Sequence, residues 1–186
     1  MIGTWMHDKL KKNIGLKRYN HSIGVMNTSI ELAKHYNCSV EKAALAGFLH
    51  DCGKLQGEKN LLKVASNFDI ILDNVMKNNK ELIHGVLGEV LAKKEYNVMD
   101  EEVLNAIRFH TTGREDMSLL EKIVYIADVI EPGRSFKGVE EIRELAYRDI
   151  NKSILYSMDN TIKFIVDRGS LMHLDTIKAR NQLIIL

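Results

Sequence analysis

Proline, cysteine and long hydrophobic runs are all scarce in this sequence of 186 residues. It contains one proline, where an average usage of about 5% would give roughly nine. Because proline is the strongest helix breaker, its scarcity leaves long helices free to form. The two cysteines, Cys38 and Cys52, cannot supply a disulfide framework and are not spaced like a C-x-x-C metal or redox pair. This cysteine usage predicts a protein of a reducing, cytoplasmic compartment.

No apolar stretch of the sequence is long enough to cross a bilayer. The longest, such as 43–49, fall far short of the roughly 18 to 20 residues needed, and residues 1–15 lack the apolar segment of a signal peptide. Neither positive nor negative charge is in clear excess, because 26 Lys and Arg nearly balance 25 Asp and Glu. The chain therefore shows no electrostatic footprint for long nucleic acid or an anionic membrane, although a local basic spot could bind a small anion.

The sequence does have helical spacing of apolar residues along nearly its whole length, without the alternation that marks a half-buried strand. At 45% hydrophobic, it can bury a sizeable core. We predict an all-α, single-domain helical bundle over residues 1–186, with its core at about 17–170 and a last helix at about 175–184. The other long helices are expected at about 17–36, 40–50, 81–95, 101–110, 119–130, 139–147 and 151–167. Ser39 and Asp100 stand just before two of them and are expected to be N-caps.

The segment 51–80 interrupts this regular pattern. It contains two glycines and the polar run KNNK, and it predicts only short helices around 61–65 and 71–75. Long irregular segments in compact domains are usually functional. We therefore expect this segment to form a lid or the rim of a site.

Six polar side chains fall on helix faces, or at helix ends, that are otherwise apolar. They are His21, His50, Asp51, His84, His110 and Asp128. The pair His50 and Asp51, for example, ends the run AALAGFL. Burying an ionised carboxylate without a partner costs several kcal/mol, so the set indicates a bound cation. A divalent metal is the economical choice because it satisfies imidazole nitrogens and carboxylate oxygens together.

Distant helices must complete such a site, because neighbouring helical residues point about 100° apart and the contiguous His–Asp pair cannot enclose an ion alone. His21 and Asp128 would complete one metal site, and Asp51 could bridge to a second ion held by His84 and His110. Two metals about 3.5 to 4 Å apart form the clamp used in phosphoester and phosphoanhydride hydrolysis. A buried hydrogen-bond network without metal is the alternative.

The pattern H…HD…H…H…D resembles the HD-domain superfamily of metal-dependent phosphohydrolases. Longer phrases carry the resemblance further: RYNHSIGV at 18–25, AALAGFLHDCGK at 43–54, IHGVLGEVLA at 83–92, VLNAIRFHTTGR at 103–114, IVYIADVIEPGR at 123–134 and DTIKARN at 175–181. Together they are similar to the bacterial YqeK-type branch, which hydrolyses diadenosine tetraphosphate symmetrically to two ADP. The resemblance spans residues 18–181.

This resemblance implies an all-helical HD fold with a two-metal centre in its core, usually iron in this branch, that activates water. The ligands it implies are His21, His50, Asp51 and Asp128 at the first metal and His84 and His110 at the second, with Asp51 bridging. The branch often has an aromatic residue where this chain has Cys52, a departure that affects packing more than chemistry.

Basic and hydroxyl-bearing residues near these ligands are candidates for contacting the substrate's phosphates. The set is Arg18, Lys54, Thr111, Thr112, Arg114, Arg134 and His173, the last of them from the resemblance alone. We expect Lys54 and Arg134, together with Asp51, to be catalytic, because cations stabilise the charge that develops on a transferred phosphoryl group. A solvated surface charge is the alternative for each basic residue.

Two further functions stay open. One is another HD phosphohydrolase, acting on nucleoside mono- or triphosphates or cyclic dinucleotides, and the other is a nucleotide-binding protein without turnover. The sequence lacks G-x-x-x-x-G-K-[ST], G-x-G-x-x-G and G-x-S-x-G, which argues against a P-loop, a dinucleotide fold and a serine hydrolase. The expected partner is a small nucleotide, and the chain could act alone or pair with a copy of itself.

Overall fold

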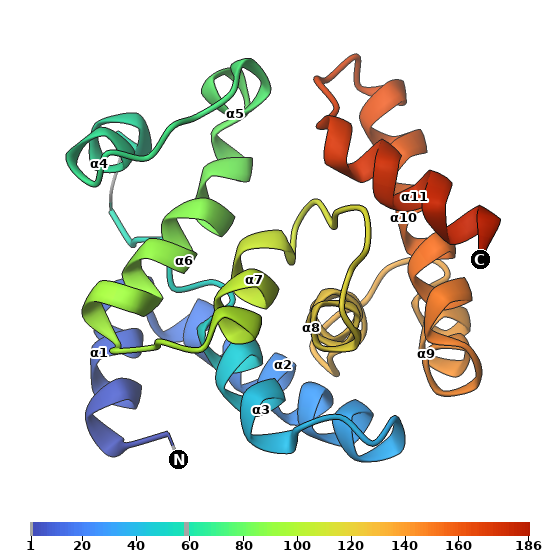
Figure 1. The fold of residues 1–186 in the computed structure, drawn as a ribbon, viewed down its shortest axis with the longest axis horizontal. Helices are drawn as coiled ribbons and strands as arrows, with labels where there is room; N and C mark the ends of the chain where they lie inside the picture. Colours follow the sequence, from blue (N-terminus) through green and yellow to red (C-terminus); the bar gives the residue numbers. More distant parts are fainter. Residues whose placement is uncertain (1, 58–59) are drawn as a thin grey trace.

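The computed structural model describes residues 2–57 and 60–186, and all regular elements in these ranges are helices (Figure 1). The all-α prediction is confirmed. The helices are α1 (Thr4–Ile14), α2 (Leu16–His35), α3 (Val40–Leu49), α4 (Leu61–Asn67), α5 (Asn74–Asn78), the 3₁₀ helix η1 (Lys80–Leu82), α6 (Ile83–Glu95), α7 (Glu101–Phe109), α8 (Leu119–Ile130), α9 (Val139–Arg148), α10 (Ile150–Asp167) and α11 (Leu174–Ile185). None of these described helices is both long enough and apolar enough to span a membrane.

Helix α8 lies at the centre of the bundle, where Figure 1 views it nearly end on. It contacts α2, α3, α7, α9 and α10. Eight of its 12 residues are buried, as is typical of a helix that is apolar on almost every side. A polar side chain on α8, such as Asp128, therefore has neighbours from several helices.

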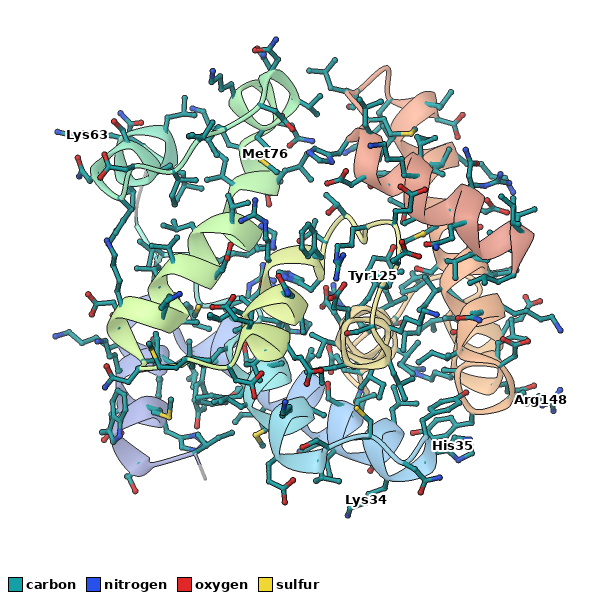
Figure 2. The ribbon with its side chains drawn as sticks, viewed as in Figure 1. Lys34, His35, Lys63, Met76, Tyr125 and Arg148 are labelled. Carbon is teal, nitrogen blue, oxygen red and sulfur yellow. The ribbon has the colours of Figure 1, made fainter. Side chains whose placement is uncertain are left out.

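The remaining helices pack on two sides of α8 (Figure 1). On one side α3 contacts both α2 and α7, and α6 packs on α7. On the other side α10 contacts α8, α9 and α11. Figure 2 shows Lys34, Lys63 and Arg148 extending from the outside of the molecule, whereas Tyr125 of α8 lies inside it and is buried. The longer helices thus direct their apolar faces to a common core.

The two expected N-caps are present. The Ser39 side chain accepts a hydrogen bond from the backbone N–H of Lys42 at the start of α3. The Asp100 carboxylate accepts from the backbone N–H groups of Glu102 and Val103 at the start of α7. Each cap satisfies backbone donors that have no partner within the helix.

Helix α1 is an element that the apolar spacing did not predict. Its buried residues are Met6, Leu10 and Ile14, which form a stripe one residue wide between lysines. Such a narrow stripe gives a weak periodic signal in the sequence. The stripe is nevertheless enough to hold α1 in place, because α1 packs against α2.

In the segment 51–80 the described residues form the short helix α4, as expected, and the short helix α5, which begins three residues later than the expected 71–75. The segment ends at the first residue of η1, and residues 58–59 within it lie outside the described residues. Helix α5 begins at an Asp73 cap, whose carboxylate accepts from the Met76 backbone N–H. The other oxygen of Asp73 is 2.7 Å from Nε2 of His173, which precedes α11. This ion pair joins the segment to the C-terminal helices.

Candidate metal centre

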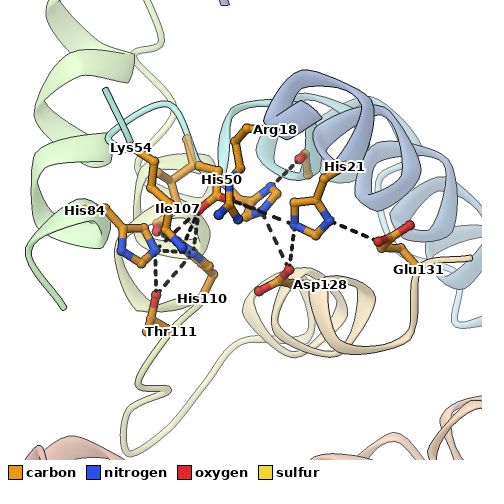
Figure 3. Close-up of polar contacts among 12 residues, drawn as sticks. Arg18, His21, His50, Lys54, His84, Ile107, His110, Thr111, Asp128 and Glu131 are labelled. Carbon is orange, nitrogen blue, oxygen red and sulfur yellow. Dashed lines mark hydrogen bonds and ion pairs between the residues drawn. The ribbon is translucent and has the colours of Figure 1, made fainter. Parts of the chain in front are cut away.

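The six predicted ligands converge, and Figure 3 shows His21, His50, His84, His110 and Asp128 gathered around one centre. They come from α2, the end of α3, α6, the end of α7, and α8. Their ligating atoms form three overlapping groups, and within each group the atoms lie within 4.8 Å of one another. The groups are His21–His50–Asp51, His50–His110–Asp128 and Asp51–His84–His110.

Asp51 lies between two pairs of histidines. Its Oδ2 atom is 3.4 Å from Nε2 of His50 and 3.9 Å from Nε2 of His21. Its Oδ1 atom is 3.4 Å from Nε2 of His84 and 3.7 Å from Nε2 of His110. The two oxygens of one carboxylate therefore face two different sites, which is the geometry of a bridging ligand.

All four histidines turn the same ring nitrogen toward the centre. In His50, His84 and His110, Nδ1 contacts the backbone carbonyl three residues earlier, at 2.8 Å for His50 and 2.7 Å for His110. In His21, Nδ1 is instead 3.0 Å from Oε1 of Glu131. Because these oxygens only accept, Nδ1 carries the hydrogen in each ring. Each Nε2 atom then presents a lone pair to the centre, as a metal ligand must.

These converging lone pairs need a cation. The Nε2 atoms of His84 and His110 are only 3.0 Å apart, and two acceptors cannot hydrogen-bond to each other. Nε2 of His50 and Oδ1 of Asp51 are buried and have no hydrogen-bond partner among the described residues. Unpaired buried polar atoms are costly. A mixed set of imidazole and carboxylate ligands fits a divalent transition metal and would satisfy all of them.

The pKa shifts of Asp51, Asp128 and His84 suit this reading. The pKa of His50 is raised, because the charge of Asp51 outweighs the burial of the ring. Burial opposes the ionisation of Asp51, but the neighbouring His50 ring holds the pKa of this carboxyl well below its usual value. Burial likewise opposes the ionisation of Asp128, but the neighbouring His21 ring and the Arg134 guanidinium lower its pKa. Burial lowers the pKa of His84 well below the ordinary histidine value, so this ring is neutral at pH 7. Ionised carboxylates and neutral imidazoles are the forms that bind metals.

The turn after α3 brings Asp51 close to α6. A Cβ atom on Gly53 would lie 2.2 Å from the backbone carbonyl oxygen of His84 and 2.8 Å from the backbone nitrogen of Gly88. Only glycine permits so close an approach. Cys52 is buried at this contact, where its Sγ atom donates to the carbonyl of Gly88 over 3.3 Å. The cysteine packs against the wall of the site, as its position in the sequence suggested.

Three cationic side chains surround the carboxylates of the centre. Nη1 of Arg18 is 2.9 Å from Oδ2 of Asp51, and Nζ of Lys54 is 3.8 Å from Oδ1 of the same residue. Nε of Arg134 donates to the backbone carbonyl of Asp128 over 2.7 Å, and its Nη2 pairs with the carboxylate. Each of the three is partly exposed to solvent. The candidates Arg18, Lys54 and Arg134 therefore all border the centre.

Two cavities open on either side of Arg18. The larger, of about 740 Å³, is lined mainly by the α1–α2 junction and by Lys17, His21, Gln56 and Arg134. The smaller, of about 250 Å³, is lined by residues that include Lys54, Lys80 and His84. Arg18 lines both. The centre is thus accessible from two directions, each with basic side chains in its wall.

The other candidates for substrate binding lie in different settings. Thr111 is at the centre, with its hydroxyl 3.1 Å from Nε2 of both His84 and His110. The Thr112 hydroxyl instead donates to the carbonyl of the next residue. His173 is tied to Asp73. The structure therefore brings Thr111 to the centre but gives Thr112 and His173 other partners.

Arg114 is likewise directed away from the centre. Its guanidinium makes two hydrogen bonds of 2.8 Å to the carboxylate of Glu121, which is buried on α8. A paired, two-point contact of this kind is strong and directional. Arg114 therefore neutralises a buried acid instead of facing the cavities.

The sequence reasoning missed Glu131, the buried partner of His21. Its position in the phrase IEPGR, three residues after a candidate ligand, was the available signal. Acidic residues after a helix are usually exposed. Only the packing of α8 against α2 shows that this carboxylate faces inward.

Comparisons with known proteins agree with this site. The HD domain family model matches residues 18–133. The chain is 42% identical to the Halalkalibacterium halodurans protein named "Bis(5'-nucleosyl)-tetraphosphatase, symmetrical", over 95% of this chain and 94% of that one. It is 38% identical to a Bacillus subtilis protein of the same name, over 94% of each chain.

A solved structure from Clostridium acetobutylicum, described as a predicted HD superfamily hydrolase involved in NAD metabolism, superposes with a TM-score of 0.92. It is 52% identical to this chain and the match covers 96% of this chain and 95% of that one. The family model and these relatives cover the helices that carry all six clustered residues. This chain therefore belongs to the HD-domain family, among relatives named symmetrical bis(5'-nucleosyl)-tetraphosphatases.

Proposed function

We propose that this protein is a symmetrical bis(5'-nucleosyl)-tetraphosphatase, which hydrolyses diadenosine tetraphosphate to two ADP at a two-metal centre. The observation that carries the proposal is the bridging position of Asp51, whose two oxygens face two separate groups of imidazole nitrogens. The names of relatives that match nearly the whole chain supply the substrate. A protein that only binds nucleotides has no need of a complete set of buried metal ligands.

In this proposal the two ions share the carboxylate of Asp51. His21, His50 and Asp128 complete the first site, and His84 and His110 complete the second. Ions bound there would lower the pKa of a coordinated water and neutralise charge on the transferred phosphoryl group. We propose iron as the metal, in keeping with the family resemblance, and the N/O ligand set accepts it.

The three cations on the carboxylates would change partners when substrate binds. Bound ions would neutralise Asp51 and Asp128, and Arg18, Lys54 and Arg134 would then be free to contact phosphate oxygens. The two arginines suit paired contacts to phosphate and the lysine acts as a point charge. Lys54 and Arg134 stabilise the charge that develops as the central phosphoanhydride bond breaks.

Symmetrical cleavage needs room for an ADP unit on each side of the bond that breaks. We assign the two units to the two cavities, because Arg18 lines both and each is also lined by one of the clustered histidines. We propose that the whole chain acts as one domain on this small nucleotide. The near-zero net charge of +1 argues against nucleic acid as the substrate.

Product analysis tests the proposal. Metal-loaded protein is incubated with diadenosine tetraphosphate, and the nucleotides are separated by ion-exchange chromatography. We expect ADP as the sole product. AMP together with ATP would contradict symmetrical cleavage, and no turnover by protein shown to hold two metals would favour the binding-protein alternative. A matched run with ATP, a cyclic dinucleotide and a nucleoside monophosphate checks the other phosphohydrolase activities.

A further inference from the structure

His21 is held differently from the other three histidines of the centre. Those three use the backbone carbonyl three residues earlier as the partner for Nδ1, whereas His21 uses the carboxylate of Glu131. The two residues lie 110 positions apart in the chain, on α2 and just after α8 (Figure 3). A ring on α2 is therefore oriented by a charged group from another part of the bundle.

The carboxylate of Glu131 is enclosed on both sides. Oε1 contacts Nδ1 of His21, and Oε2 accepts from the backbone N–H of Gly133 over 2.6 Å. A Cβ atom at Gly24 would lie 2.5 Å from Oε2, and one at Gly133 would lie 2.8 Å from Oε1. Two glycines from different segments thus leave the space that this carboxylate fills.

We infer that Glu131 is a positioning residue, whose carboxylate fixes the tautomer and the orientation of His21 so that Nε2 faces the first metal site. The inference rests on the proposed role of His21 as a ligand. A carboxylate that accepts from a ligating imidazole keeps the ring in one orientation and makes its other nitrogen a better donor. In this role Glu131 acts through His21 and is not itself a metal ligand.

A purely structural role for Glu131 is the competing explanation, because the hydrogen bond that it accepts from Gly133 also holds the turn after α8. The variant Glu131→Gln separates the two roles. A glutamine has one acceptor oxygen and cannot replace both carboxylate oxygens. If its oxygen stays with the backbone N–H, its amide group faces His21 and favours the tautomer in which Nε2 carries the hydrogen. That tautomer cannot ligate a metal.

A second variant perturbs the same carboxylate without touching Glu131. In Gly24→Ala, the new Cβ atom meets Oε2, the end of a flexible side chain, so the carboxylate moves while the helix stays. Alanine is also a better helix former than glycine at this interior position of α2. Weaker metal binding in this variant would not come from a weakened helix.

Metal titration of the metal-free proteins measures the effect, with Co²⁺ followed by its absorption bands and melting curves recorded for the metal-free forms. We expect Glu131→Gln and Gly24→Ala to weaken metal binding by roughly 10- to 100-fold and to alter the Co²⁺ spectrum. As a matched control, Glu121→Gln changes another buried glutamate, paired with Arg114 away from the centre. Its metal affinity should match the wild type, whatever its melting temperature.

His21→Ala separates failure of this inference from failure of the proposed ligands. Wild-type metal affinity in both Glu131→Gln and Gly24→Ala, with His21→Ala impaired, would overturn the positioning role alone. Wild-type affinity in His21→Ala as well would show that His21 is not a ligand, and the inference would fall with that assignment. Should Glu131→Gln not fold, Gly24→Ala decides the outcome.

Discussion

The two halves of the centre are built from similar residues but differ in charge. The half around His21 and His50 has Asp128 beside it and Glu131 behind it. The half around His84 and His110 shares only one oxygen of Asp51, and its rings are held by neutral backbone carbonyls. Since carboxylates attract a divalent ion more strongly than neutral donors do, we expect the first half to bind its ion more tightly.

The surroundings of the two halves differ as well. The first half faces the larger cavity with two arginines in its wall, and the second faces the smaller one beside Lys54. The smaller cavity is bordered by the segment before α6, which is tied to the C-terminal helices by an ion pair. One half is therefore set in the helical core, whereas the other is also shaped by a less regular rim.

Replacing Asp51 should impair metal binding in both halves of the centre, because both depend on its carboxylate. Asp51→Asn removes a negative charge that both ions share. Because the bound ions contribute several kcal/mol of transition-state stabilisation, activity should fall by about 10³-fold or more. Metal content measured by elemental analysis should fall with it. Asp159→Asn, at a partly exposed ion pair with Arg180, is the matched control and should keep full activity and both ions.

Replacing His84 should affect one half alone. In His84→Ala the second ion loses one of its few ligands, so metal occupancy should fall from two ions to one. Activity should fall by roughly 100-fold or more, because hydrolysis needs both ions of the two-metal site. The fold should persist, because the polar contacts of this ring are with the Glu81 carbonyl and with other side chains of the centre. Unchanged activity in both His84→Ala and His110→Ala would reduce the centre to one ion.

Stepwise removal of metal should reveal the expected difference in metal affinity between the two halves of the centre. A chelator added in steps should remove the ion of the second half first, giving two separate phases in a titration followed by elemental analysis. Each ion at 100 times its dissociation constant stabilises the folded protein by about 2.7 kcal/mol, so the melting temperature should drop in both phases. A single phase with simultaneous loss of both ions would contradict the proposed inequality.

Weakening the contact between Asp73 and His173 at the rim of the smaller cavity should have the smallest effect on activity. Asp73→Asn weakens the pair with His173 and should raise KM about two- to fivefold with little change in kcat, a loss within the range of a partly exposed ion pair. An equal fall in kcat would show that the rim does more than shape the cavity. Asn74→Ala, next to it on α5, is the control.

The same ion pair has a predictable pH dependence. Burial opposes the ionisation of Asp73, but hydrogen bonds from the Met76 backbone N–H and from His173 hold its pKa below the usual value. A carboxyl with a lowered folded-state pKa stabilises the protein above its unfolded pKa of about 4 and loses this contribution as the pH falls through the folded value. Acid melting curves of wild type and Asp73→Asn should therefore converge below about pH 4.

Much of the fold could be predicted from the sequence. Long amphipathic stretches predicted the major helices, and the caps at Ser39 and Asp100 marked two of their starts. Helix α1 was not predicted, because its stripe of three buried residues is too narrow to give a clear periodic signal. Local patterning identifies an element only when several turns of the chain repeat it.

The candidate site was only partly predictable. Inward histidines and aspartates on apolar faces identified the residues that converge, yet the same reasoning placed Arg114 near the substrate, where the structure pairs it with Glu121. It also passed over Glu131. The partner of a charged side chain depends on which helices meet, and a single helix does not carry that information.

The amino-acid sequence alone determined that this chain is helical and that certain polar side chains must be buried together, because helical periodicity and the cost of burying charge are local properties of the chain. Only the tertiary structure decided that the two oxygens of Asp51 face different histidine pairs and that Glu131 holds His21. These relations depend on distances of a few ångströms between helices far apart in the sequence, and such distances are fixed only when the helices pack around α8.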